Sequence, residues 1–221
     1  MSLLTLQDIK ENREIKTFLE IAERQLEIQG YTEHSFRHVG LVSKSAGDIL
    51  ESLGFGEREI ELARIAGYMH DIGNAVNRVD HAHSGAIMAY NILTKMGMDC
   101  REAAEIMLAI GNHDENTGTA VSNISAALIL ADKSDVHRSR VRNSDFATFD
   151  IHDRVNYAVD DSDIYIDEKE RTAALELHID TKICPVMDYF EIFLARMSMC
   201  RRAADFLELH FQLIINGTRL L

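Results

Sequence analysis

The chain contains very few residues that interrupt helices. Its 221 residues include one proline and twelve glycines, which is about half of the roughly 12% that these two residue types usually contribute together. Because proline and glycine are the strongest local breakers of regular structure, their scarcity favours long helices. Hydrophobic residues make up 46% of the chain, so it can bury a substantial core and is not expected to be disordered.

Apolar residues recur at helical spacing through the first two thirds of the chain. We predict helices over residues 6–30, 41–53, 57–73, 83–97, 99–110 and 122–131. Asp99 and Glu102 form a capping-box pattern at the start of the fifth segment, and Ser122 begins the sixth. This part of the chain is therefore expected to be entirely helical.

The pattern changes near residue 150. Apolar and polar residues alternate in segments 155–159, 175–179 and 207–215, which predicts half-buried strands, and a helical pattern covers 186–200. An acidic run over 160–170 lacks the central glycine and ligand spacing of a calcium loop, and we predict a solvated pair of turns there.

These patterns predict a mainly α fold in two parts. Residues 1–148 are expected to form a helical domain, and residues 149–221 an extension packed on it. The extension is predicted to contain three or four antiparallel strands and one helix.

Charge and cysteine content exclude several classes of protein. With 23 Lys and Arg against 36 Asp and Glu, the net charge is −13, which argues against binding along a nucleic-acid backbone. Three widely spaced cysteines indicate reduced thiols and a cytoplasmic protein. The first eight residues lack the features of a secretory signal, and the longest uncharged stretch, 116–131, is too short and polar to span a membrane.

Ten histidines stand out in so acidic a chain. His38 and His113 lie in register with the apolar residues of their helices, His70 follows small residues in register, and Asp132 ends the most apolar helix. Buried imidazoles and carboxylates need partners, and they are the usual ligands of Fe, Mn, Zn or Ni. No cysteine lies near them in the sequence, which argues against a structural thiolate zinc site. The pattern predicts a divalent-metal site.

The order of these residues resembles the HD-domain superfamily of metal-dependent phosphohydrolases. His38 comes first, His70 and Asp71 follow in Met-His-Asp-Ile-Gly, and Asp132 stands in Leu-Ala-Asp-Lys-Ser-Asp. The resemblance covers about residues 30–140. It implies a helical bundle, the HD-type fold, in which these four side chains bind a divalent metal.

Two further histidines resemble those of family members with two metals. His83, in His-Ser-Gly-Ala-Ile, is similar to a His-x-x-Gly-Ala stretch that opens the next helix, and His113, in Gly-Asn-His-Asp-Glu, matches a fifth histidine. The resemblance thus implies two divalent ions bridged by Asp71, with iron or manganese preferred over zinc, nickel or magnesium. A one-metal site in which His83 and His113 contact the substrate remains open.

Two other histidines are close in sequence to the expected ligands. His34 lies one turn before His38 and remains an alternative for the first ligand. His81 is expected to be a loop residue, and a position that supports a metal ligand is the alternative.

The resemblance implies hydrolysis of a phosphomonoester or phosphodiester of a nucleotide or other small metabolite by a metal-activated water. His70 and Asp71 are the residues expected to carry catalysis, and the cations would attract an anion to a negative protein. Lys133 and Arg37, each next to an expected metal ligand, are the nearest basic candidates for binding the substrate phosphate.

Other functions remain open. Asn74 stands where the cyclic-dinucleotide phosphodiesterases of this family have lysine, and their His-His-Glu and Gly-Tyr-Pro signatures are absent, so cleavage of cyclic di-GMP is not expected. The alternatives are a di-iron oxygenase of HD type and a non-catalytic HD module that binds a ligand. The C-terminal extension is expected either to cap the site or to form a subunit interface of a homo-oligomer.

Overall fold

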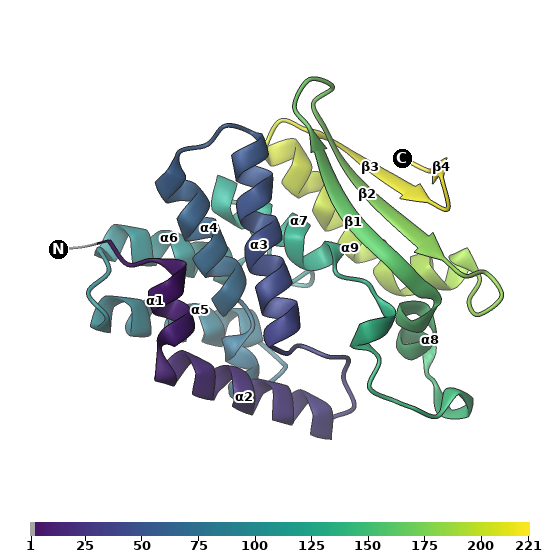
Figure 1. Cartoon of the computed structure of the whole chain (residues 1–221), viewed down its shortest axis with the longest axis horizontal. Coiled ribbons are helices and arrows are strands. Elements are labelled where there is room, and N and C mark those ends of the chain that lie inside the picture. The colour runs from purple at the N-terminus through teal and green to yellow at the C-terminus, as the bar shows by residue number, and fades with distance from the viewer. Residues whose placement is uncertain (1–2) are drawn as a thin grey trace.

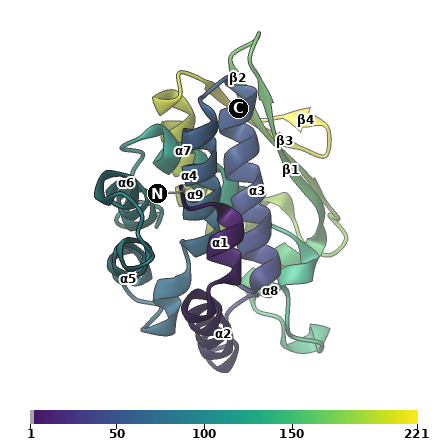
Figure 2. The same cartoon turned by 60° about the vertical axis from the view of Figure 1, so that its left-hand side comes forward.

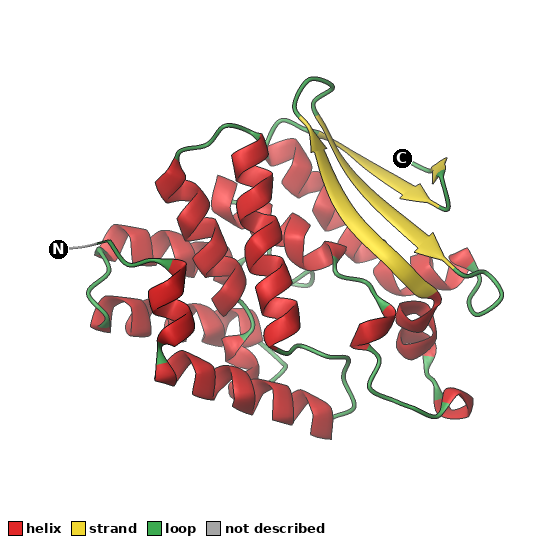
Figure 3. Ribbon diagram, viewed as in Figure 1, coloured by secondary structure: helices red, strands yellow, loops and turns green. Residues whose placement is uncertain are grey.

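The computed structural model of the chain describes residues 3–221. The N-terminal segment that was expected to lack a secretory signal begins with Met1 and Ser2. These two residues lie outside the described residues. Helices fill one side of the molecule, and a small sheet with its own helices lies at the other (Figures 1 and 3). Within residues 3–221, no helix combines the length and apolar character that a membrane span requires.

The first part of the chain is helical, as predicted. Its α-helices are α1 (Leu6–Glu11), α2 (Arg13–Ile28), α3 (Phe36–Ser52), α4 (Glu57–Met69), α5 (His81–Lys95), α6 (Cys100–Gly111) and α7 (Asn123–Ser134). A short 3-10 helix, η1 (Ile72–Ala75), links α4 to α5, and two more, η2 (Arg138–Arg140) and η3 (Phe146–Thr148), follow α7. α5 and α6 pack side by side, on the side of the bundle away from the sheet (Figure 2).

Polar side chains begin the helices where the sequence suggests. The side chain of Asp99 accepts a hydrogen bond from the backbone N–H of Arg101, so that it caps α6. The expected capping box is not formed, because Glu102 instead accepts a 2.7 Å hydrogen bond from Arg58 of α4. Ser122 caps α7, and its capping box is completed by Ser125.

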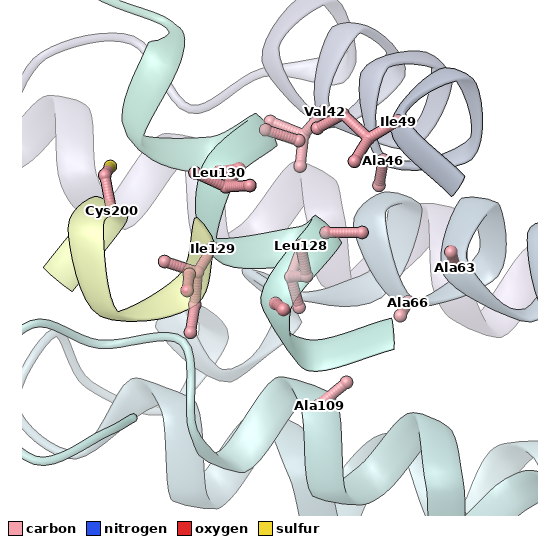
Figure 4. Packing of buried hydrophobic residues seen from close by; sticks show 14 of the residues in the cluster. Val42, Ala46, Ile49, Ala63, Ala66, Ala109, Leu128, Ile129, Leu130 and Cys200 are labelled. Atoms are coloured by element: carbon pink, nitrogen blue, oxygen red, sulfur yellow. The ribbon is translucent and has the colours of Figure 1, made fainter. Parts of the chain in front are cut away.

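Helix α7 runs through the centre of the molecule. All of its residues after the first are buried, including Asp132 and Lys133, and it packs against α3, α4, α6 and α9 (Val186–Phe206). Apolar side chains of these neighbours surround it, as Figure 4 shows for Leu128 and Ile129. Burying a leucine or isoleucine side chain contributes about 1.5–3 kcal/mol. This burial holds the polar end of α7 inside the protein.

The C-terminal part contains α8 (Ile151–Ala158), α9 and a sheet of four strands in the order β1-β2-β3-β4. The strands are β1 (Val159–Asp167), β2 (Thr172–Ile179), β3 (His210–Ile215) and β4 (Thr218–Arg219). The predicted fold class, mainly α with a small C-terminal sheet and helix, is confirmed. The sheet is mixed, however, because β2 and β3 pair in parallel through the crossover that α9 provides, whereas the other two pairs are antiparallel.

Two local predictions in this part are wrong. Residues 155–158 belong to a helix, which begins after Asp150 caps the N–H of Asp153. The acidic run, expected as turns, lies largely in β1, because Ile164 and Ile166 alternate with its acidic residues and become half-buried. One buried apolar cluster includes residues of both parts of the chain, and a boundary at residue 148 stays a prediction.

A close approach at Gly73 fixes where α5 begins. A Cβ atom at this position would overlap the carbonyl oxygen of His81 and lie 2.5 Å from the backbone nitrogen of Gly85. Real Cβ atoms do not approach other atoms so closely, and both neighbours here are backbone. Only glycine therefore allows η1 to pack against the first turn of α5.

Gly73→Ala is expected to separate η1 from α5 and to lower the free energy of unfolding by about 1–3 kcal/mol, the usual cost of overpacking. Gly40→Ala is the matched control, because a Cβ there meets no described atom within 4 Å and alanine favours a helix by up to about 1 kcal/mol. Urea unfolding followed by circular dichroism would measure both. Equal stability of the two variants would contradict the packing argument.

Candidate metal centre

Six buried side chains converge from the ends of five helices. Each lies in a terminal turn or directly beside one, so that the helices fix the position of its side chain. The residues are His38 in α3, His70 and Asp71 after α4, His81 at the start of α5, His113 after α6, and Asp132 in the last turn of α7.

The imidazole rings face one another through their Nε2 atoms in two pairs. The distance is 3.3 Å between His38 and His70, and 3.2 Å between His81 and His113. The rings of His70 and His113 also lie edge to face, with centroids 5.0 Å apart, which joins the two pairs into one cluster.

The other ring nitrogen, Nδ1, is fixed in every member of these pairs. In His70, His81 and His113 it donates to the carbonyl oxygen three residues earlier, at 2.8, 3.0 and 2.6 Å. In His38 it donates to Oδ2 of Asp135 at 2.7 Å. The carbonyl oxygens and the Asp135 carboxylate only accept, so Nδ1 carries a proton in each ring, and when a ring is neutral the lone pair of its Nε2 points into the cluster. This is the tautomer that a metal requires from an Nε2 ligand.

The carboxylate of Asp71 lies between the two pairs. Its Oδ2 atom is 3.3 Å from Nε2 of His70 and 3.7 Å from Nε2 of His38, and its Oδ1 atom is 3.6 Å from Nε2 of His81. Asn74 donates to Oδ1 at 2.8 Å, whereas the buried Oδ2 has no hydrogen-bond partner among the described residues. Leaving such an oxygen unpaired is costly, and a cation beside it removes the cost.

The second carboxylate, Asp132, closes the other side of the first pair. Its Oδ1 atom lies 3.4 Å from Nε2 of His38 and 3.6 Å from Nε2 of His70. Its Oδ2 atom lies 2.7 Å from Nζ of Lys133. One oxygen therefore remains directed at the histidines while the other is neutralised.

The two carboxylates create a demand for positive charge. Burial opposes protonation of His70, but the nearby negative charges of Asp71 and Asp132 outweigh it and raise the pKa of His70 to about 10. Burial also disfavours ionised carboxyls, yet His70 lowers the pKa of Asp71, and Lys133 that of Asp132, well below their usual range. Either a proton on His70 or a divalent cation would neutralise part of the negative charge of Asp71 and Asp132.

The donors in the cluster fit divalent cations. Three overlapping sets have ligand atoms within 4.8 Å of one another: His38, His70 and Asp71; His70, His113 and Asp132; and Asp71, His81 and His113. Neutral imidazoles with inward lone pairs and an unpaired carboxylate oxygen are what such ions need.

The structure brings together five of the six predicted ligands, but not His83. The His83 side chain is 54% exposed and lies near Asp80, on the outer side of α5. His81, expected to be a loop residue, takes its place at the cluster. Gly85, four residues after His81, lies on the same helix face and packs against Gly73, whereas His83 is only two residues from Gly85. The four-residue spacing between His81 and Gly85 is the feature of the sequence that could have identified His81 as the inward-facing histidine.

The two histidines near the start of α3 have different partners. His38 faces the cluster, and Nε2 of His34 instead accepts from Nη2 of Arg140 at 3.1 Å. His34 is buried and its ring centroid lies 5.5 Å from that of His38. It therefore lies beside the cluster but offers it no free nitrogen.

The two basic residues expected near the substrate are already paired with carboxylates. Arg37 binds Glu33 at 2.7 Å and Asp135 at 3.0 Å. Lys133 lies 2.8 Å from Oε2 of Glu115 besides its contact with Asp132. Their role in binding a phosphate stays a prediction.

Sequence reasoning assigned no role to two supporting residues. Asp135 orients His38, and Asn74 orients Asp71. Asp135 is the last residue of Leu-Ala-Asp-Lys-Ser-Asp, and Asn74 directly follows Met-His-Asp-Ile-Gly. Their side-chain contacts depend on how the helices pack, which the motifs do not specify.

Comparison with known proteins adds three findings. The family model of the HD domain matches residues 33–191, which include all six side chains of the cluster. An uncharacterized protein of Methanocaldococcus jannaschii is 27% identical, in an alignment that covers 61% of this chain and 60% of that protein, so that the chain spans less than two thirds of this relative's length. The chain is also similar to the crystal structure of a predicted HD superfamily hydrolase from an uncultured Thermotogales bacterium. The two are 28% identical in sequence over 61% of this chain and 75% of that one, with a TM-score of 0.45.

Asp135→Asn is expected to lower the affinity for Mn²⁺ by roughly 10- to 100-fold, because the partner that orients a metal-binding histidine loses its charge. Calorimetric titration of the folded variant with Mn²⁺ measures this. Asp205→Asn, at an exposed carboxylate of α9, is the matched control and should bind like the unaltered protein. Unchanged affinity in folded Asp135→Asn would show that Asp135 does not support a metal ligand.

Proposed function

Because the chain belongs to the HD domain family, we propose that it is a metal-dependent phosphohydrolase with two divalent cations in the cluster. The reaction is hydrolysis of a phosphomonoester or phosphodiester of a nucleotide or another small metabolite. Family membership alone does not fix a reaction, so the proposal rests on the arrangement of the side chains.

The observation that carries the proposal is the position of Asp71. Its two oxygens face different histidines, Oδ2 toward His38 and His70 and Oδ1 toward His81. A carboxylate placed in this way between two sets of imidazoles is suited to bridge two ions. Imidazole and carboxylate ligands without a thiolate favour iron or manganese, with zinc, nickel or magnesium as alternatives.

When bound, such ions supply a nucleophile by lowering the pKa of a water, and they neutralise phosphate oxygens. The residues of the chain keep the donors in position for this chemistry. Asp135 holds the ring of His38, Asn74 holds the carboxylate of Asp71, and Lys133 balances the charge of Asp132. Burial of the whole cluster limits access to a small substrate rather than to the backbone of a nucleic acid, which the net charge of −13 also disfavours.

Asp71→Asn is expected to remove bound metal and to lower phosphate release by at least about 1000-fold, because the variant loses the negative charge shared by both histidine pairs. Elemental analysis of the purified protein and a panel of phosphomonoesters and phosphodiesters measure the two effects. Oxygen consumption is recorded in parallel. Full hydrolysis by Asp71→Asn would overturn the proposal, and substrate cleavage that requires oxygen would favour the di-iron oxygenase instead.

His81→Ala and His83→Ala form a matched pair on one helix. Since His81 faces the cluster and His83 faces solvent, His81→Ala is expected to lower the metal content from about two ions per chain to about one. His83→Ala should retain both. Loss of metal in His83→Ala, or none in His81→Ala, would contradict the assignment of the second ion.

A further inference from the structure

A cavity of about 460 Å³ lies beside the metal-ligand cluster. Its walls come from the segment before α3, the segment between η1 and α5, the segment after α6, η2, α8 and α9. The lining residues that matter here are His34, Arg78, Glu115, Arg140, Phe193 and Arg196. This volume lies within the range of small-molecule sites.

The cavity adjoins the cluster at two points. His34, in its wall, lies next to His38 with ring centroids 5.5 Å apart. Arg78, also in its wall, has Nη1 3.3 Å from Nε2 of His81. A second cavity of about 400 Å³ shares Arg78 with the first and is lined by His81 itself. A ligand in the second cavity would therefore contact His81, and a ligand in the first would contact His34 and Arg78, which lie next to His38 and His81.

Three guanidinium groups line the cavity, and each is held by the protein. Arg140 is almost fully buried and donates to the carbonyl oxygens of Glu33 and Asp135. Arg196 donates to Oε1 of Glu115 at 3.1 Å. A guanidinium has five N–H donors in a planar fork, so each group retains donors for a ligand.

Arg78 has the least neutralised charge of the three. Its Nη1 atom lies 3.3 Å from Oδ1 of Asn74 and 3.3 Å from Nε2 of His81, and no carboxylate of residues 3–221 lies within 4.0 Å of its guanidinium. By contrast, Arg37 and Lys133 each contact two carboxylates. The charge least neutralised by carboxylates is therefore that of Arg78, in the wall of the cavity, whereas Arg140 and Arg196 each lie near one carboxylate.

We propose that Arg78, Arg140 and Arg196 form the site for the phosphate-bearing end of the substrate, and that α9 completes this site through Arg196. The inference rests on the proposed function. Planar guanidinium groups bind phosphate oxygens through paired, charge-assisted hydrogen bonds, and three of them surround one cavity next to the cluster.

The rest of the lining selects the organic part of the substrate. The aromatic rings of Phe193 and Tyr31 are covered by the guanidiniums of Arg196 and Arg78, at 4.5 and 5.8 Å from the ring centroids. The wall is therefore polar rather than a free stacking surface. The lining also includes Asp150, Asp153 and Asn156, whose oxygen atoms can accept hydrogen bonds from hydroxyl groups, and the two carboxylates would repel a second phosphate. The substrate is a phosphomonoester of a small polyhydroxylated compound.

Residues outside the matched family segment build part of this cavity. The family match covers residues 33–191, whereas Gly30 and Tyr31 precede it and Phe193 and Arg196 follow it. Helix α9 is fixed by its packing against α7, so Arg196 projects from a rigid support. The C-terminal part of the chain thus gains a role in recognising the substrate.

The test uses inorganic phosphate as the probe, titrated calorimetrically into the Mn²⁺-loaded protein. Arg196→Gln should weaken phosphate binding by roughly 10- to 100-fold, the effect of losing hydrogen bonds to a charged group. Glu115 still contacts Lys133 in this variant, so its carboxylate is not left unpaired. Arg202→Gln, at an exposed arginine of the same helix, is the matched control and should bind phosphate normally. Metal content and melting temperature confirm that both variants are loaded and folded.

A second measurement separates this inference from the proposed function. Phosphate release from ribose 5-phosphate should exceed that from phenyl phosphate, and Arg196→Gln should raise KM for ribose 5-phosphate. If phosphate binding depends on Arg196 but neither ester is hydrolysed, the proposed function fails and the anion site stands. If Arg196→Gln binds phosphate as Arg202→Gln does, the anion site is overturned whether or not hydrolysis occurs. A preference for phenyl phosphate would overturn the polyhydroxylated class of substrate.

Discussion

The negative charge of two buried carboxylates, Asp71 and Asp132, constrains the whole centre of the molecule. A buried ion without a partner costs several kcal/mol, about as much as the entire stability of many domains. The helices must therefore bring positive charge or lone-pair donors to these oxygens, and they do so at their ends. The same constraint explains why Lys133 is buried, since α7 carries it inward together with Asp132.

Much of the helical part and most of the cluster could be predicted from the sequence, because one physical property reveals both. Apolar periodicity identifies the buried face of each helix, and a histidine in register with that face must also point inward, as His38 and His113 do. Apolar periodicity does not identify the buried face in the first turn of a helix, because no preceding turn is present to define that face. Asp80, with φ of 58°, redirects the chain just before α5, and the choice between His81 and His83 depends on that turn.

The remaining features depend on contacts between distant segments, which local patterns do not encode. The alternation over 155–159 is too short to distinguish a strand from a helix, and the capping by Asp150 decides for the helix. The parallel pairing of β2 with β3 follows from the path of α9. In the same way, Arg78, Arg140 and Arg196 are far apart in sequence and form one wall only after α9 packs against α7.

The overall charge of −13 and a site for an anion are compatible because charges act over a limited distance. At physiological ionic strength the Debye length is about 8 Å, so most exposed carboxylates are screened from the cluster. Three guanidiniums line the cavity together with three carboxylates, Glu115, Asp150 and Asp153, so the local charge is balanced rather than strongly negative, and Arg78 lacks a carboxylate partner among the described residues. Cations held by Asp71 and Asp132 would add to the field of these guanidiniums. The electrostatic potential that acts on a bound anion would therefore be set by the groups of the site and not by the net charge of the protein surface.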